Sequence, residues 1–199
     1  LTDIDGNVYQ TVPIGDQLWM KENLRVTHYR NGDEIPTGHS STDWSYLSTG
    51  AYAVYDSNET NADTYGYLYN WFVVGDSRNI APEGWHVPTD DEWTALTDYL
   101  GGESVAGGKM KEVGTEHWYS PNTGATNESG FTALPGGHRQ ASNGYYGDIG
   151  GKGYVWSSTV SGSDAWCRRL EWNDPGVDRY SYSKGRGFSV RCVRDTTIG

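Results

Sequence analysis

The chain has 199 residues, enough for one domain with a sizeable core, and a net charge of −11 at pH 7. This acidity argues against a nucleic-acid partner, and no run of roughly 18 apolar residues is present that could cross a membrane as a helix. Only 35% of the residues are hydrophobic, but 9 Trp and 15 Tyr are among them, so we expect aromatic rings to build the core.

Short strands and loops are expected in the first third of the chain. Residues 8–12 alternate between the two faces of a half-buried strand, and residues 17–20 form a second strand after the turn signal Gly15-Asp16. Residues 30–64 are polar and are predicted to be mostly loop. Residues 65–74 are apolar enough for a buried helix, with a strand as the alternative.

A helix over residues 90–100 is the clearest local prediction. Thr89 is an N-cap residue, and Glu92 stands three residues later, which is the spacing of a capping box. Trp93, Leu96 and Leu100 fall on one stripe of this helix, and the following Gly101 and Gly102 end it.

The second half of the chain returns to strands, which are expected over residues 130–134, 154–158, 165–172 and 187–193. Long loops rich in Gly, Asn, Tyr and Ser separate them. The whole pattern predicts an α+β fold, with two helices and a twisted antiparallel sheet, in a single domain that spans residues 1–199.

Several motifs lie along the chain in the order found in one bacterial family. Among them are Tyr-Gly-Tyr-Leu-Tyr-Asn-Trp at residues 65–71 and Gly-Trp-His-Val-Pro-Thr-Asp-Asp-Glu-Trp at residues 84–93; the others cover residues 2–9, 17–25, 120–131 and 187–195. In these motifs the chain resembles the Fibrobacter succinogenes major paralogous domain. Residues 87–93 and 187–191 are also similar, more distantly, to the formylglycine-generating-enzyme group.

The resemblance implies a C-type-lectin-like fold and a location outside the cell, on the bacterial surface. Domains of this kind occur in lipoproteins and large adhesins, where some are calcium-dependent modules that hold the free C-terminus of a protein. We therefore expect a monomeric module, cut from a larger protein, that binds Ca²⁺ and a peptide. A glycan is the alternative ligand, and a structural spacer without a ligand is the third possibility.

Catalysis is not expected. The five His residues are scattered and form no metal-binding pair, and the sequence has neither a nucleophile elbow nor a phosphate-binding loop. Enzymes of the formylglycine-generating group use closely spaced cysteines, whereas Cys167 and Cys192 lie far apart in the sequence.

Calcium ligands are expected around the sequence Trp-Asn-Asp, which C-type lectins carry at a similar place. Calcium prefers six to eight oxygen ligands, and carboxylate and amide oxygens are concentrated here. The candidate ligands are Asp148, Glu171, Asn173, Asp174 and Asp178. The alternative is a plain turn, because Asn, Asp, Pro and Gly are the leading turn residues.

Candidate ligand-binding residues lie in the same region. Arg168 shares a strand face with Trp172, and its planar guanidinium could hold a carboxylate, although internal pairing of the arginines with nearby acids is the alternative. Aromatic and amide side chains would add contact area, and the candidates are Asn143, Tyr145, Tyr146, Trp172, Tyr180 and Tyr182.

A disulfide between Cys167 and Cys192 is expected, because an extracellular setting permits it. Strand alternation opposes it in part, since it places Cys192 with Phe188 and Val190 but Cys167 with Arg169. Two buried free thiols are the alternative.

Overall fold

Three long antiparallel strands form the main sheet of the computed structural model, which describes residues 1–196. They are β8 (Lys152–Ser161), β9 (Asp164–Glu171) and β10 (Asp178–Ser183), in the order β10-β9-β8. β8 and β9 confirm the two expected strands, and β10 was not predicted. Gly162, at a φ of 61°, lies in the tight turn that joins β8 to β9.

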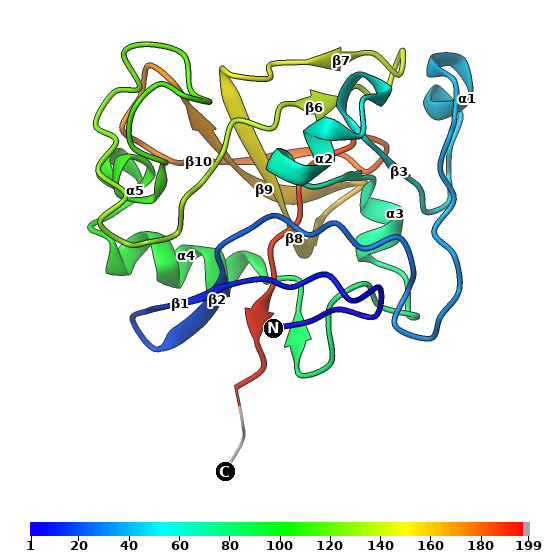
Figure 1. The fold of residues 1–199 in the computed structure, drawn as a ribbon, viewed down its shortest axis with the longest axis horizontal. Coiled ribbons are helices and arrows are strands. Elements are labelled where there is room, and N and C mark those ends of the chain that lie inside the picture. The colour runs from blue at the N-terminus through cyan, green and yellow to red at the C-terminus, as the bar shows by residue number, and fades with distance from the viewer. Residues whose placement is uncertain (197–199) are drawn as a thin grey trace.

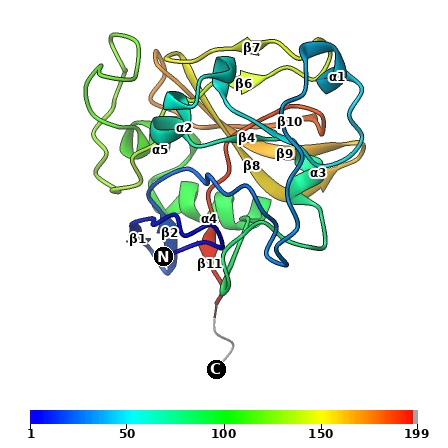
Figure 2. The same cartoon turned by 45° about the vertical axis from the view of Figure 1, so that its right-hand side comes forward.

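A four-stranded sheet joins the beginning of the chain to its end. Its strands are β1 (Thr11–Ile14), β2 (Gln17–Met20), β5 (Trp85–His86) and β11 (Val193–Arg194), in the order β1-β2-β11-β5. The expected hairpin around Gly15-Asp16 is present, although β1 begins three residues later than predicted. The N-terminus and the last described residues therefore lie at the same end of the molecule (Figures 1 and 2).

The predicted helix is confirmed as α4 (Asp90–Tyr99), together with its capping box. The Glu92 backbone amide donates to the Thr89 hydroxyl at 3.2 Å, and the Thr89 amide donates to the Glu92 carboxylate at 2.8 Å. Trp93 and Leu96 are buried on the face of α4 that packs against β8 and β9. The second long helix, α5 (Glu103–Met110), was not predicted, because Gly107 and Gly108 lie inside it.

The expected helix over residues 65–74 is only partly correct. The segment contains β4 (Leu68–Tyr69), which pairs with β3 (Tyr52–Ala53), and ends with the single turn α3 (Trp71–Val74). The buried side chain of Asn70 separates the two, because its oxygen accepts from the Val73 amide and from the Ala51 amide.

The remaining short elements fall mostly in segments that were predicted as loop. They are α1 (Ser41–Ser45), the 3-10 turn η1 (Tyr55–Ser57), α2 (Thr60–Tyr65), β6 (His138–Arg139) and β7 (Tyr146–Gly147). The structure thus has five α-helices within residues 1–196 in place of the expected two. Across that part of the chain no helix has the length and apolar composition needed to cross a bilayer.

Two expected strands are not strands over their full length. Residues 130–134 contain Thr132 at a φ of 57°, and their only β-bridge within residues 1–196 joins Ala133 to Lys111. Residues 187–193 are held by isolated bridges, from Phe188 to Tyr69 and from Ser189 to Val155, before β11 begins. The fold is therefore α+β, as expected, but with several antiparallel sheets rather than one.

Aromatic side chains build the core, as the composition predicted. In one cluster the rings of Tyr154 and Phe188 stack with centroids 4.8 Å apart, and Trp156 lies 4.4 Å from Phe188. In the other, Trp19 contacts Trp93 at 4.7 Å, and Phe131 packs edge-on against both. The first cluster joins the main sheet to β4 and α3, and the second joins it to α4 and the four-stranded sheet.

Candidate functional site

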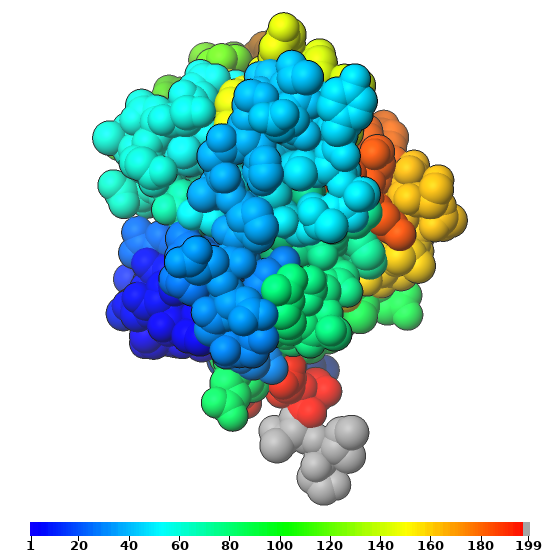
Figure 3. Space-filling model, turned by 90° about the vertical axis from the view of Figure 1, so that its right-hand side faces the viewer, coloured from blue at the N-terminus to red at the C-terminus, as the bar shows by residue number. Residues whose placement is uncertain are grey.

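A cavity of about 580 Å³ is lined by segments that are far apart in the sequence. They are α1 and the residues after it, the start of α3, residues 140–142, Ser163 and the turn at residues 183–186. Figure 3 shows this side of the molecule, where the blue and cyan part of the chain lies beside the orange-red turn that follows β10.

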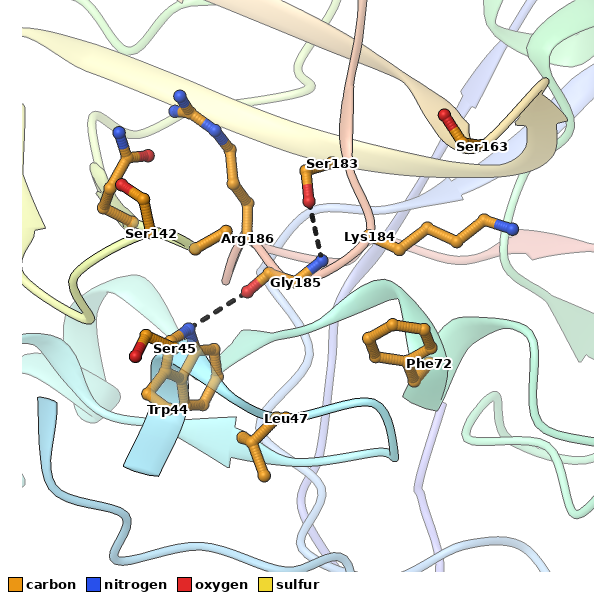
Figure 4. A pocket seen from close by; sticks show the side chains of 12 residues that line it. Trp44, Ser45, Leu47, Phe72, Ser142, Ser163, Ser183, Lys184, Gly185 and Arg186 are labelled. Atoms are coloured by element: carbon orange, nitrogen blue, oxygen red, sulfur yellow. Dashed lines mark hydrogen bonds between the residues drawn. The ribbon is translucent and has the colours of Figure 1, made fainter. Parts of the chain in front are cut away.

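The cavity is built on a hydrogen-bonded base. The indole nitrogen of Trp44, which is 1% exposed, donates to the carbonyl oxygen of Gly185 at 3.0 Å, so α1 is tied to the turn (Figure 4). The Gly185 amide in turn donates to the Ser183 hydroxyl at 3.4 Å. Leu47 and Phe72 add apolar surface to the same cavity.

The charge of this cavity is opposite to that of the whole chain. Lys184 and Arg186 line it, no Asp or Glu does, and neither base forms an ion pair with any residue of the 1–196 segment. The two side chains leave the turn in different directions on either side of Gly185 (Figure 4). Lys184 lies over the ring of Trp71, and Arg186 over that of Tyr182. A cavity of this kind attracts anions.

The predicted calcium ligands at the ends of β9 and β10 are paired with bases of the chain. Glu171 forms ion pairs with Arg169 at 2.9 Å and with Lys152 at 3.3 Å, and Asp178 pairs with Arg169 at 2.8 Å. Burial opposes the charge of Arg169, but the contacts with Asp178 and Glu171 raise the pKa of its guanidinium. The internal pairing that the sequence left as an alternative is therefore present for Arg169.

A lysine ammonium holds together the loop in which calcium was expected. Lys111 is fully buried, and its Nζ donates to the carbonyl oxygens of Thr123, Glu171 and Asp174 at 2.8–2.9 Å. Its Nζ also lies over the ring of Trp118, 5.4 Å from the centroid. The ammonium therefore binds backbone oxygens of the Trp-Asn-Asp loop around a positive charge, as a bound metal ion would.

One contact of the loop is typical of a turn, which was the alternative to a calcium site. The Asp174 carboxylate accepts from the Gly176 amide at 2.6 Å, and Asn173 is exposed. Asp148 lies in a different loop, where its carboxylate accepts from the Tyr154 hydroxyl at 2.7 Å. Burial and this hydrogen bond raise the pKa of Tyr154.

A different trio of potential metal ligands lies close together. Atoms of Glu112, Glu116 and His117 fall within 4.8 Å of one another, and His117 Nδ1 lies 2.8 Å from the Glu112 carboxylate. None of the predicted calcium ligands belongs to this trio.

The prediction that Arg168 binds a ligand is wrong. Arg168 is 1% exposed, and its guanidinium donates to the Asp90 carboxylate at 2.7 Å and to the Thr94 hydroxyl at 3.1 Å. The strand face that carries Arg168 packs against α4, so the side chain is enclosed between helix and sheet. Arg179 also binds Asp90, at 2.6 Å, and stacks on the ring of Trp166.

The predicted aromatic ligand residues are divided among separate clusters. Tyr182 packs against the cluster of Phe188, Trp172 against the cluster of Trp19, and Tyr146 against a third, small cluster around Trp44. Tyr145 and Tyr180 are exposed, with Arg169 over the Tyr180 ring; the Asn143 side chain accepts from the Tyr145 amide. These residues therefore do not act as one surface.

The expected disulfide is not formed, and both cysteines are buried free thiols. Strand order gives the reason. β8 lies between β9, which carries Cys167, and the segment of residues 187–193, which carries Cys192. Two strand spacings amount to about 10 Å, beyond the limit of about 7 Å between the Cα atoms of a disulfide.

Comparison with known proteins identifies the family. The family model of the Fibrobacter succinogenes major domain matches residues 12–194, which is nearly the whole chain. The chain belongs to this family. No curated protein and no solved structure matches it.

Within this family member, sequence reasoning did not find the residues of the cavity. One signal was available, since Lys-Gly-Arg at residues 184–186 places two bases around a glycine in an acidic chain. Trp44 and Phe72 gave no such signal, because only the folded chain brings α1, α3 and the turn together.

Proposed function

We propose that this domain is a ligand-binding module of a bacterial surface protein and that it takes a peptide through a carboxylate. The observation that carries the proposal is the acid-free cavity of about 580 Å³ with Lys184 and Arg186 at its wall. A C-type-lectin-like fold, a location outside the cell and the absence of catalysis are parts of the same proposal, which extend the family resemblance to this chain.

A peptide fits this cavity better than a glycan does, for two reasons. First, the bases Lys184 and Arg186 form no ion pair within residues 1–196, so a carboxylate would find free positive charge. Second, Phe72 and Leu47 offer apolar surface for a neighbouring side chain, while the serines and the turn offer hydrogen bonds to a peptide backbone.

Calcium is not needed for this mode of binding. Among the expected ligands, Glu171 and Asp178 pair with bases, and Lys111 holds the loop of Asp174. We therefore expect peptide binding to persist in EDTA and to weaken as the salt concentration rises, since salt screens the attraction between charges near the surface.

The test is an array of peptides with free and amidated C-termini, set beside a glycan array, with hits measured by calorimetry. Free acids should bind, and amidation should weaken binding about tenfold. Lys184→Gln and Arg186→Gln should each weaken binding by a similar factor. Arg194→Gln removes the same charge at the far end of the molecule, on β11, and should leave binding unchanged.

Other outcomes would favour the alternatives. Loss of binding in EDTA would contradict the calcium-independent mode and favour a calcium-bridged ligand. Binding to glycans alone would make the domain a lectin, and the absence of any ligand on both arrays would make it a spacer.

A further inference from the structure

A second, smaller cavity lies behind Trp44. It has a volume of about 220 Å³ and is lined by residues 37–39, the segment around Val54 and Ser57, Glu59, Arg139 and Tyr146. Arg139 lies 4.4 Å over the ring of Trp44, which also lines the larger cavity. The stacked pair of Trp44 and Arg139 therefore stands between the two cavities.

Arg139 is a buried cation without a counter-ion. It is 4% exposed, and it forms no ion pair with any acid of residues 1–196. Its Nε donates to the Gly144 carbonyl and one Nη2 hydrogen to the His39 carbonyl, both at 2.9 Å. The rings of Trp44 and Tyr146 flank the guanidinium on its apolar sides.

The other buried arginines show that this arrangement is unusual in the molecule. Arg168 is neutralised by Asp90. Arg191 has no acid partner, but its Nε, Nη1 and Nη2 all donate, to Asn23 and to the carbonyls of Phe131 and Thr132. Arg139, by contrast, has no hydrogen-bond partner for Nη1 in the described part of the chain.

A second unpartnered polar atom lines the same cavity. His39 Nε2 is buried and has no hydrogen-bond partner within residues 1–196, although the backbone of His39 is fixed by Arg139. Buried polar groups are nearly always paired, because an unpaired one costs about 1–3 kcal/mol. The cavity thus has one buried unpaired nitrogen, on His39, and one guanidinium nitrogen of Arg139 without a partner in the described chain, and together they point to a missing acceptor.

We propose that this cavity binds a small carboxylate, which accepts from Arg139 Nη1 and from the Nε2–H tautomer of His39. A carboxylate has two oxygens for the two donors, and the volume admits a short carbon chain behind them. The acid Glu59 lines the cavity from its exposed position and disfavours a doubly charged phosphate more than a singly charged carboxylate. The site does not depend on the peptide site proposed above.

Glu59 offers a variant that should improve binding without touching the two donors. Within residues 1–196 its carboxylate accepts a single, long hydrogen bond, from the Tyr67 hydroxyl at 3.3 Å. Glu59→Gln keeps the size of the side chain and removes the repulsion. Asp63→Asn is the matched control, because Asp63 is a nearby exposed acid on α2 that lies outside this cavity.

The experiment is an NMR titration of the whole domain with acetate and propionate at constant ionic strength, repeated with sulfate and phosphate. Saturable shifts are expected at His39, Arg139 and Tyr146. Glu59→Gln should tighten acetate binding about threefold, and Asp63→Asn should not change it. His39→Ala should weaken it about tenfold, and Arg139→Met should abolish it.

The outcomes separate this proposal from its alternatives. The absence of saturable shifts, or a Glu59→Gln variant that binds no better than Asp63→Asn, would overturn it. Tighter binding of sulfate or phosphate would overturn the assignment to a carboxylate. Lys184→Gln should leave the acetate shifts at His39, Arg139 and Tyr146 unchanged. An error in the proposed peptide site and an error in this carboxylate site would therefore give different results. If Arg139→Met does not fold, the acetate affinities of the Glu59→Gln and His39→Ala variants decide whether the cavity binds a carboxylate.

Discussion

The ammonium of Lys111 lies 2.8 Å from the carbonyl oxygen of Asp174, so the C-cap residue that follows α5 is tied directly to the loop after β9. Two further carbonyls, of Thr123 and Glu171, accept from the same nitrogen. One buried cation therefore fastens three segments of the chain.

Replacing Lys111 by Met should destabilise the fold by about 3 kcal/mol or more, because three carbonyl oxygens would lose their donor at about 1–3 kcal/mol for each one left unpaired. Urea denaturation followed by Trp fluorescence measures this change. The control is Lys109→Met, which removes a half-exposed pair with Glu128 and should cost less than about 1 kcal/mol. Equal midpoints for the two variants would contradict the role of Lys111.

Asp90 is the shared partner of Arg168 and Arg179, and Asp90→Asn should cost about 3–5 kcal/mol, since it leaves the buried Arg168 without a counter-charge. The neighbouring Asp91 is exposed on the same turn of α4, so Asp91→Asn should change the free energy of unfolding by no more than about 0.5 kcal/mol. Thermal or urea unfolding of both variants checks the difference. A loss of less than about 1 kcal/mol for Asp90→Asn would mean that the ion pairs of Asp90 with Arg168 and Arg179 do not hold α4 against the sheet.

His86 should make stability depend on pH. Its Nε2 lies 2.8 Å from Glu92 and its Nδ1 2.6 Å from Asp195, and the hydrogen bond to Glu92, opposed by burial and helped by Asp195, raises its pKa. Because the folded pKa exceeds the unfolded value of about 6.5, the contribution is complete below that value. It is then lost as the pH rises through the folded pKa.

The measurement is the free energy of unfolding of the wild type and of His86→Gln, at about pH 6 and about pH 9. The advantage of the wild type should be larger at the lower pH. An advantage that is the same at both pH values would show that the two carboxylates do not hold the protonated imidazole.

The two thiols should be unreactive in the native protein. Burial raises the pKa of Cys167 to about 12 and raises the pKa of Cys192 as well, so almost no thiolate is present at neutral pH. A thiol reagent such as DTNB should find two groups in denatured, unreduced protein and almost none in native protein. An intact mass lower by about 2 Da without reductant would instead reveal a disulfide.

Short sequence patterns were enough to predict the elements whose stabilising contacts lie between residues close together in the sequence. The capping box of α4 joins Thr89 to Glu92, three residues apart, and the β1–β2 hairpin is closed by Gly15 and Asp16, so each could be predicted from a short stretch of sequence. The segment at residues 65–74 could not, because Asn70 caps α3 and also binds Ala51 and Thr49, which come from another part of the chain.

The candidate sites were harder to predict for the same reason. Chemistry alone made Asp174 and Glu171 good calcium ligands and Arg168 a good anion receptor. Only the fold shows that Arg169 pairs with Glu171, that Asp90 pairs with Arg168, and that Lys111 binds the backbone carbonyl of Asp174. Arg139 and His39 carried no visible signal, because their missing partners become apparent only once burial and every hydrogen bond are known.

The sequence by itself determined the family, the acidic and aromatic character, the α+β class and the capped helix α4. The tertiary structure alone decided which charges are free. Asp90 pairs with Arg168 across 78 residues of sequence, and Lys111 donates to the backbone carbonyl of Asp174 across 63, whereas Lys184, Arg186 and Arg139 form no ion pair with an acid within the described chain. The physical reason is that an ion pair depends on distance in space and on exclusion of water, and neither quantity is encoded in the spacing of residues along the chain.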